Sequence, residues 1–202
     1  MRNFVWIAMA LATSLGGSAS ASGCVDVTSD LDRLACYDKE SGRTPTPSSL
    51  SSMSTNWEAE EETSKLSDKK SVFLNTRSVE DINCGWNKGA KIWLSLRCHE
   101  NTTAVIFRTG CHMTSSEYNS YGDIQYRVDA EKSKTLSATE STDNRALGLW
   151  SGGKAIPFIK EMIGKEKLVV KMTPYGENPF TATFNIGDLD TVLGPLRKEC
   201  GW

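Results

Sequence analysis

Six cysteines constrain this chain more than any other feature, because all of them follow a segment that is typical of an export signal. Arg2 precedes a mostly apolar run over residues 4–15, and Ala19-Ser20-Ala21 has the small-x-small pattern of a cleavage site. The run is too short to span a membrane, which takes about 20 apolar residues. The sequence therefore predicts a signal peptide over residues 1–21, cleaved after Ala21, and a periplasmic or secreted protein without a transmembrane span.

A lipoprotein signal is the alternative interpretation of the same segment, with Cys24 acylated after Ser22-Gly23. Alanine stands at position 21, where such a signal usually has leucine. One acyl chain by itself also binds a membrane only weakly. We therefore do not expect a lipid anchor at Cys24.

An even number of cysteines in an exported chain predicts a set of disulfides. Sequence alone does not choose among the possible pairings of Cys24, Cys36, Cys84, Cys98, Cys111 and Cys200. Zinc is the alternative, because Cys98-His99 and Cys111-His112 offer two thiols and two imidazoles. Neighbouring residues on a strand point to opposite faces, so neither pair suits one tetrahedral ion. We expect disulfides and no metal or other cofactor.

The first two cysteines bracket the stretch "VDVTSDLDRLA". Thr28 or Ser29 can cap a short helix in this stretch, and its apolar residues keep helical spacing at Leu31, Leu34 and Ala35. Because a helix this short is marginal alone, a Cys24–Cys36 bridge would hold it. We predict a cysteine-clamped helical motif over residues 22–42, with a bond from Cys36 to the main domain as the open alternative.

Residues 43–56 are rich in proline and serine and predict a flexible or partly extended linker. The acidic run over residues 58–62 predicts a solvated face. The chain has 23 basic and 25 acidic residues and shows no basic cluster. Nucleic acid is therefore not an expected ligand, since its binding needs clustered Lys or Arg.

Residues 57–202 predict a β-rich domain, because from Ser71 onward the apolar pattern has mainly period two. In "KIWLSLRC" one face carries Trp93, Ser95 and Arg97, and the other carries Ile92, Leu94, Leu96 and Cys98. A turn centred near Asn101 would place Leu96 opposite Ile106 and Cys98 opposite Ala104. Since that register separates Cys98 from Cys111, it favours the pairs Cys84–Cys111 and Cys98–Cys200.

Later segments continue the pattern. Residues 122–129 alternate as a strand, and residues 167–173 and 180–186 predict a hairpin. A helix is expected from about Lys154 to Gly164, because Pro157 belongs in a first turn, and a second short helix begins near Asp188. Gly194-Pro195 should break or kink it. The expected fold class is α+β and β-rich, with an antiparallel sheet or sandwich, two short helices and stabilising disulfides.

The order of these features resembles the TagO (VasI) family of type VI secretion accessory proteins. The matching pieces are "RLACYD", "WLSLRC", "YRVD", "LWSGGKAIPFIKEM", "TATFNI" and the closing "ECGW", over residues 24–38 and about 91–202. "RLACYD" and "ECGW" are the more specific of these. The additional cysteines Cys84 and Cys111 depart from the family pattern. The resemblance implies an accessory protein with a partner in the cell envelope.

The sequence contains no recognised catalytic motif, and both histidines stand next to cysteines. Arg127, Asp129, Trp150 and Ser151 lie in the segments that resemble the family and are candidates for a partner-binding surface. The structural alternative is an Arg–Asp pair with a core tryptophan. We therefore expect a non-enzymatic exported adaptor. A free-standing periplasmic binding module, such as an inhibitor of a cell-wall hydrolase, is the alternative.

Overall fold

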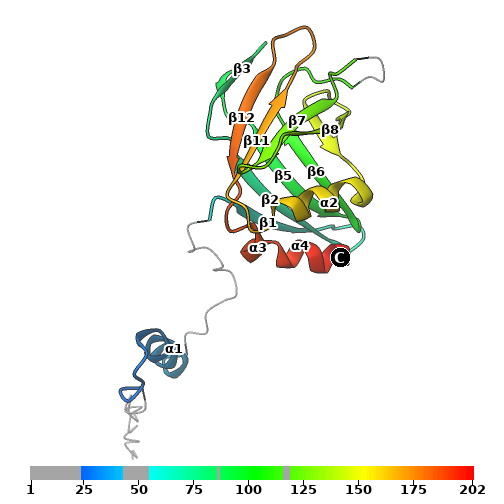
Figure 1. The fold of residues 1–202 in the computed structure, drawn as a ribbon. Coiled ribbons are helices and arrows are strands. Elements are labelled where there is room, and N and C mark those ends of the chain that lie inside the picture. The colour runs from blue at the N-terminus through cyan, green and yellow to red at the C-terminus, as the bar shows by residue number, and fades with distance from the viewer. Residues whose placement is uncertain (1–23, 43–54, 86, 116–118) are drawn as a thin grey trace, which may run out of the picture. The chain divides into compact units, whose positions relative to one another are not determined.

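The computed structural model describes residues 24–42, 55–85, 87–115 and 119–202, in two units, Met1–Met53 and Ser54–Trp202 (Figure 1). Within the described residues, the first unit contains α1 (Asp30–Glu40) and the second contains all the strands and the other helices. The expected signal peptide and residues 43–54 of the expected linker lie outside the described residues. The domain boundaries drawn from the sequence remain predictions.

The first unit is a helix fastened to the segment before it. A Cys24–Cys36 disulfide joins the two, with 5.7 Å between the Cα atoms. The helix begins directly after Ser29, whose carbonyl oxygen accepts the backbone N–H of Arg33 at 2.9 Å. The Arg33 guanidinium also donates to the carbonyl of Val27 at 3.4 Å. The bridge thus closes the entry of a helix that is too short to be stable by itself.

Two antiparallel sheets build the second unit (Figure 1). The first has the order β1 (Glu58–Thr63), β2 (Lys70–Arg77), β5 (Trp93–His99), β6 (Thr102–Arg108), β10 (Ala146–Leu149) and β9 (Thr139–Glu140). The second has the order β12 (Phe180–Asn185), β11 (Lys167–Met172), β7 (Asp123–Val128) and β8 (Lys134–Ser137). A small hairpin pairs β3 (Ile82–Cys84) with β4 (Asn87–Ala90).

One core lies between the inner face of the first sheet and the elements that cover it. The cover consists of the second sheet, α2 (Gly152–Met162) and α4 (Gly194–Cys200), and the short α3 (Leu189–Val192) precedes α4. Figure 1 shows α2 across β5 and β6, with α3 and α4 at the end of the sheet. The core contains Ile92, Leu94, Leu96 and Cys98, the face expected from the alternation. The β-rich antiparallel fold expected from the sequence is confirmed.

The register of β5 and β6 differs by one residue from the expected one. Cys98 lies opposite Thr103 and Leu96 opposite Val105, instead of Ala104 and Ile106. The two strands are joined by Glu100 and Asn101, whose φ angles of 48° and 60° define a two-residue turn with the twist of a tight hairpin. Because side chains alternate, the shift turns Val105 and Phe107 into the core, and Ala104 and Ile106 onto the outer face.

The helices differ from expectation in two places. α2 begins at Gly152, before the expected Lys154. Pro157 therefore lies in its second turn, where it is exposed. Because proline has no N–H, one helical hydrogen bond is missing on the solvent side. The expected second helix is broken before Pro195, as the sequence predicted, but both parts are helical, α3 and α4, because proline is favoured in the first turn of a helix. The described part of the second unit therefore has three helices instead of the expected two.

The acidic run over residues 58–62 is solvated, and it also forms most of the edge strand β1, which the sequence pattern did not predict. All six residues of β1 are exposed. Pairing with β2 makes it a strand, and Arg77 and Lys70 lie 3.5 and 3.7 Å from carboxylates of Glu58 and Glu61. Charged side chains on an edge strand oppose pairing with a further sheet.

Candidate functional site

A groove lies on the outer face of the first sheet, the face turned away from the core. Its volume is about 1060 Å³, and alternate residues of β5, β6 and β10 reach it, together with the loop over residues 140–145. We call it the outer groove; its lining residues are Asn87, Lys91, Trp93, Arg97, Ile106, Arg108, Thr109, Gly110, Glu140, Ser141, Thr142, Asp143, Arg145, Ala146 and Trp150.

The apolar part of the outer groove is a small cluster separate from the main core. Ala104, Ile106 and Ala146 are buried, and Trp150 packs against them. The Trp150 ring also lies over Gly148, where an added Cβ would be 2.6 Å from the ring, and its Nε1–H donates to the carbonyl of Thr139 at 3.0 Å. These contacts fix the ring of Trp150 against the sheet.

Arginine side chains stand beside both tryptophans of the outer groove. The guanidinium carbon of Arg77 is 4.2 Å from the centre of the Trp93 ring, and that of Arg108 is 5.8 Å from it. The guanidinium carbon of Arg97 is 5.6 Å from the centre of the Trp150 ring. Such cation–π contacts stabilise the pairs and orient the guanidinium groups.

Arg97 differs from the other two arginines in its polar partners. Arg77 lies 3.5 Å from the Glu58 carboxylate, and Arg108 donates to Asn75 Oδ1 at 3.2 Å. Within the described residues, the side chain of Arg97 forms no hydrogen bond or ion pair, and its Nε is buried. Burial lowers the pKa of the Arg97 guanidinium, but arginine stays protonated in proteins. The outer groove therefore contains an unpaired cation.

Charge in the outer groove is positive on balance. Its lining includes Lys91, Arg97, Arg108 and Arg145 against only two carboxylates, Glu140 and Asp143. The Ser115 hydroxyl donates to Glu140, and the Ser141 hydroxyl donates to Asp143 at 2.5 Å. These hydrogen bonds lower the pKa of both carboxyl groups, so both are ionised at neutral pH. The lining of the outer groove still has more cations than anions when both carboxylates are charged.

The four candidate residues taken from the sequence do not lie together. Trp150 lines the outer groove, and the neighbouring Ser151 is exposed at the start of α2, where its carbonyl accepts the N–H groups of Lys154 and Ala155. Arg127 is exposed on β7 of the second sheet. Whether any of the four contacts a partner stays a prediction.

Asp129 has a local structural contact instead of the suggested pair with Arg127. Its φ is 47°, and its carboxylate accepts the backbone N–H groups of Glu166 and Lys167 at 3.1 and 2.8 Å. No ion pair joins Arg127 and Asp129 in the described part of the chain. These bonds attach the end of β7 to the start of β11.

Trp93, Arg97 and Arg108 of the outer groove were not among the candidate residues taken from the sequence. The alternation in "KIWLSLRC" placed Trp93 and Arg97 on one face, but only the true register with β6 brings Ile106 and Arg108 onto that face. The sequence therefore indicated which side chains of β5 point outward, but not which side chains of β6 do so.

The cysteines leave no thiolate for zinc in the described residues. The structure joins Cys84 to Cys111 and Cys98 to Cys200, with Cα separations of 5.6 and 5.7 Å, the pairs favoured by the sequence. His99 shares a hydrogen bond of 2.8 Å with the Ser71 hydroxyl, and the His112 ring packs near Tyr175. Neither histidine lies with a second imidazole and a thiolate, as the zinc alternative requires.

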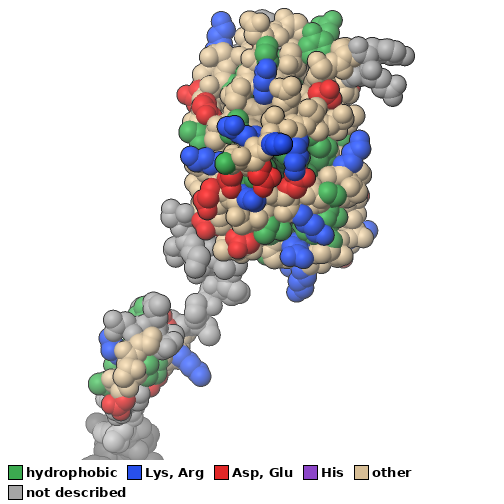
Figure 2. Space-filling view, viewed as in Figure 1, with side chains coloured by type: hydrophobic (Ala, Val, Ile, Leu, Met, Phe, Trp, Pro, Cys, Tyr) green, Lys and Arg blue, Asp and Glu red, His purple; other side chains and the backbone are tan. Residues whose placement is uncertain are grey.

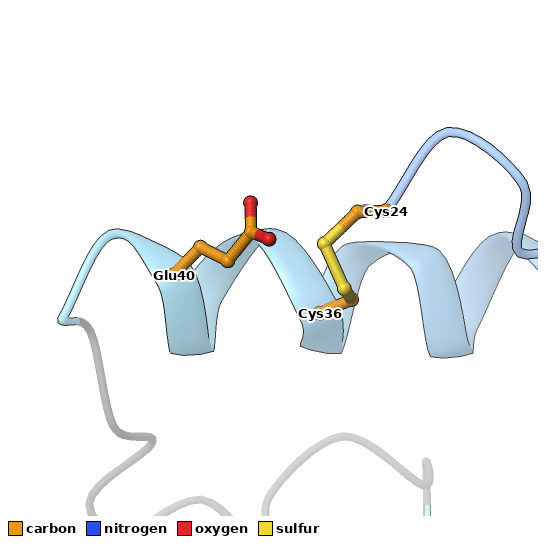
Figure 3. Close-up of side chains that lie close together, drawn as sticks. All are labelled: Cys24, Cys36 and Glu40. Atoms are coloured by element: carbon orange, nitrogen blue, oxygen red, sulfur yellow. A yellow bond between two sulfur atoms is a disulfide. The ribbon is translucent and has the colours of Figure 1, made fainter. Parts of the chain in front are cut away.

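Among the described residues, one cluster has three side chains of metal-ligating type, and they are Cys24, Cys36 and Glu40. Figure 3 shows the two sulfur atoms joined and the carboxylate of Glu40 one turn further along α1. Disulfide sulfur is not a thiolate, so the oxidised cluster offers one carboxylate and does not form a metal site. No described helix has the length and apolar content of a membrane span.

The fold and the outer groove define a disulfide-bonded, β-rich domain with a surface groove that combines aromatic and cationic side chains. The chain belongs to the VasI family: the family model described as "Type VI secretion system VasI, EvfG, VC_A0118" matches residues 23–202. The chain is therefore a type VI secretion-associated protein, as its resemblance to the TagO (VasI) family indicated.

Among solved structures, the chain is similar to the crystal structure of invasion associated protein B from Bartonella henselae, with a TM-score of 0.46 and 13% identity. That likeness covers 71% of this chain and 92% of the other. No curated protein matches the sequence significantly.

Proposed function

We propose that this protein is an exported, non-enzymatic accessory protein of a type VI secretion system that acts by binding a protein partner in the cell envelope. The observation that carries the proposal is the outer groove, in which an unpaired arginine and two tryptophan rings lie on a rigid sheet. Buried aromatic and arginine side chains dominate the energy of protein interfaces. Membership of the VasI family supports the secretion pathway.

Two observations support the periplasm as the compartment. Three disulfides form and persist in an oxidising environment such as the periplasm. The apolar segment and the small-x-small pattern before Cys24 supply the route for export. We therefore expect the mature protein in the periplasm, with Cys24 in its disulfide instead of acylated.

A binding role accounts for the side chains of the outer groove better than catalysis does. Its lining residues include carboxylates, arginines and hydroxyls, but neither a histidine nor a cysteine. Both carboxylates have their pKa lowered, which makes them poor general acids at neutral pH. Aromatic rings beside an unpaired arginine are suited to binding a protein partner.

Deletion of the gene in a strain with a working type VI secretion system tests the proposal. We expect reduced effector release and reduced killing of prey cells, both restored by the wild-type gene in trans. Cell fractionation of the complemented strain should recover the protein from the periplasm. Unchanged release and killing after deletion would contradict the secretion role, and inhibition of a lysozyme or amidase by the purified protein would support the hydrolase-inhibitor alternative instead.

A further inference from the structure

We propose that the outer groove binds an acidic segment of the partner protein, with Arg97 as the anchor for a partner carboxylate and the rings of Trp93 and Trp150 as contacts for neighbouring apolar side chains. The inference rests on the proposed function, because it specifies the chemistry of the partner. It follows from the chemistry of Arg97, from the combination of charged and apolar side chains in the outer groove, and from the fixed positions of these side chains on the sheet.

Arg97 supplies the strongest of these observations. A guanidinium can form two parallel hydrogen bonds to one carboxylate, a geometry that lysine cannot reproduce. Buried polar groups normally have hydrogen-bond partners, and a buried donor without one is costly. The Nε of Arg97 is buried without an acceptor, whereas Arg77 and Arg108 have Glu58 and Asn75. A carboxylate brought by a partner would pair with the guanidinium of Arg97, whose side chain is partly exposed.

The charges around the outer groove favour a protein segment over a polyanion such as nucleic acid as the ligand. Nucleic acid binding needs many clustered cations along a phosphate backbone. Glu58 and Glu60 lie opposite Asn75 and Phe73 on this same face, and Glu140 and Asp143 line the loop side of the groove. A densely charged polymer would meet these carboxylates, whereas a peptide with one or two acidic side chains can place them at Arg97 alone.

The apolar surfaces fit the remainder of such a peptide. Ile106 and Ala146 lie in the lining between the two tryptophan rings and the arginines. Leucine or other apolar side chains beside the acidic one would be removed from water there, at about 25 cal/mol for each Å² buried. The arrangement is therefore complementary to alternating apolar and acidic side chains.

The anchor is held in place before a partner arrives. Arg97 stands on β5, which is paired on both sides, with Phe73 of β2 and Ala104 of β6 opposite it. Trp150 is fixed by Thr139 and by its contact with Gly148. Binding to rigid side chains loses less conformational entropy than binding to mobile ones, so the geometry supports affinity as well as specificity.

Peptide binding to the mature, disulfide-bonded protein tests the inference. The probes are a labelled peptide that repeats Ser-Leu-Glu and its counterpart that repeats Ser-Leu-Gln, titrated by fluorescence anisotropy. We expect the glutamate peptide to bind at least about tenfold more tightly, because a charge-assisted hydrogen bond to arginine is stronger than a neutral one. Arg97→Met should remove this preference, and Arg97→Lys should recover only part of it.

The matched control is Lys171→Met, which removes an exposed cation from β11 of the other sheet and should leave both affinities unchanged. Circular dichroism and the urea midpoint establish that each variant is folded. Equal affinity for the two peptides would overturn the inference. So would equal loss of binding in the Arg97 and Lys171 variants, or a single-stranded DNA oligonucleotide that binds as tightly as the glutamate peptide.

Two further outcomes separate this inference from the proposed function. If Arg97→Met restores effector release as well as the wild-type gene does in the deletion strain, the secretion role stands and the acidic-segment inference fails. If the gene deletion itself has no effect, the secretion role fails, whatever the peptides show. Sedimentation of a dimer that Arg97→Met abolishes would assign the outer groove to a second copy of the chain and would also overturn the inference.

Discussion

Gly148 shows how closely single residues are fitted to the outer face of the first sheet. A Cβ added at this position would be 2.6 Å from the Trp150 ring, closer than real Cβ contacts. The ring cannot move away easily, because its Nε1–H is bonded to the carbonyl of Thr139. Any side chain at position 148 must therefore displace the tryptophan that forms one wall of the outer groove.

Gly148→Ala should lower the free energy of unfolding by about 1–3 kcal/mol, the usual cost of overpacking. Gly153→Ala is the matched control, because an added Cβ meets nothing within 4 Å there and the residue lies in α2. It should raise the free energy of unfolding by about 0.5–1 kcal/mol through helix propensity and a less flexible unfolded chain. Urea denaturation with the disulfides intact measures both, and similar changes in the two variants would contradict the tight fit at Gly148.

Tyr126 is a titratable residue whose environment resists ionisation. Burial raises its pKa, and so does its hydrogen bond of 3.0 Å to the Glu161 carboxylate, together giving a pKa of about 12. In the unfolded chain, the tyrosine hydroxyl ionises near pH 10. The stabilisation from neutral Tyr126 is thus fully present below about pH 10 and is lost as the pH rises through 12.

The ultraviolet absorbance of tyrosinate should show one tyrosine that titrates late, near pH 12. Tyr126→Phe should remove that step. Glu161→Gln should move it to lower pH, since the carboxylate charge is gone, but not as far as the ordinary value, since burial remains. A late step that persists in Tyr126→Phe would assign the raised pKa to another residue.

At the scale of elements, the disulfides fasten pieces that backbone hydrogen bonds leave separate. Cys98–Cys200 ties α4 to the central strand β5, across 102 residues of sequence. Cys84–Cys111 ties the β3–β4 hairpin to the segment after β6, across 27 residues. In the chain-entropy model, the longer closed loop restricts the unfolded chain more.

Replacement of both cysteines of a pair by alanine should therefore rank the two bridges. Loss of Cys98–Cys200 should cost about 2–5 kcal/mol of unfolding free energy, and about 1 kcal/mol more than loss of Cys84–Cys111. Guanidinium denaturation of the two double variants measures the difference. A larger loss from the Cys84–Cys111 pair would show that native-state contacts around β3, instead of loop length, control the stability.

At the scale of the whole molecule, the second unit has a complete core of its own. Every residue of the main hydrophobic cluster lies between Trp57 and Trp202. Figure 2 shows charged side chains of both signs spread over the visible face of this unit, as expected for a surface in water. Its stability therefore does not require residues 24–42.

Deletion of residues 24–42 from the mature protein should leave the unfolding free energy of the second unit within about 0.5 kcal/mol of the full chain, the range of changes outside a core. If the cysteine-clamped motif is a second partner contact, the same deletion should reduce effector release. Urea denaturation and the secretion assay give the two results. A marked loss of stability would show that residues 24–42 contribute to the folded second unit.

The sequence by itself determined the inward face of β5 and the break before Pro195. The alternation of Ile92, Leu94, Leu96 and Cys98 fixes which side of β5 is buried, because side chains on a strand alternate whatever its neighbours are. The short helix between the first two cysteines and the predicted hairpin also favoured the pairs that the structure joins.

Only the tertiary structure decided the register between strands, the edge strand β1 and the outer groove. A period of two fixes the faces of one strand but not its alignment with the next, and a shift of one residue moved Ala104 and Ile106 to the opposite face. β1 has no apolar pattern and becomes a strand by pairing with β2. The outer groove needs Arg97, Arg108 and Trp150 in one register across three strands, and hydrophobic alternation does not encode such an alignment of polar side chains.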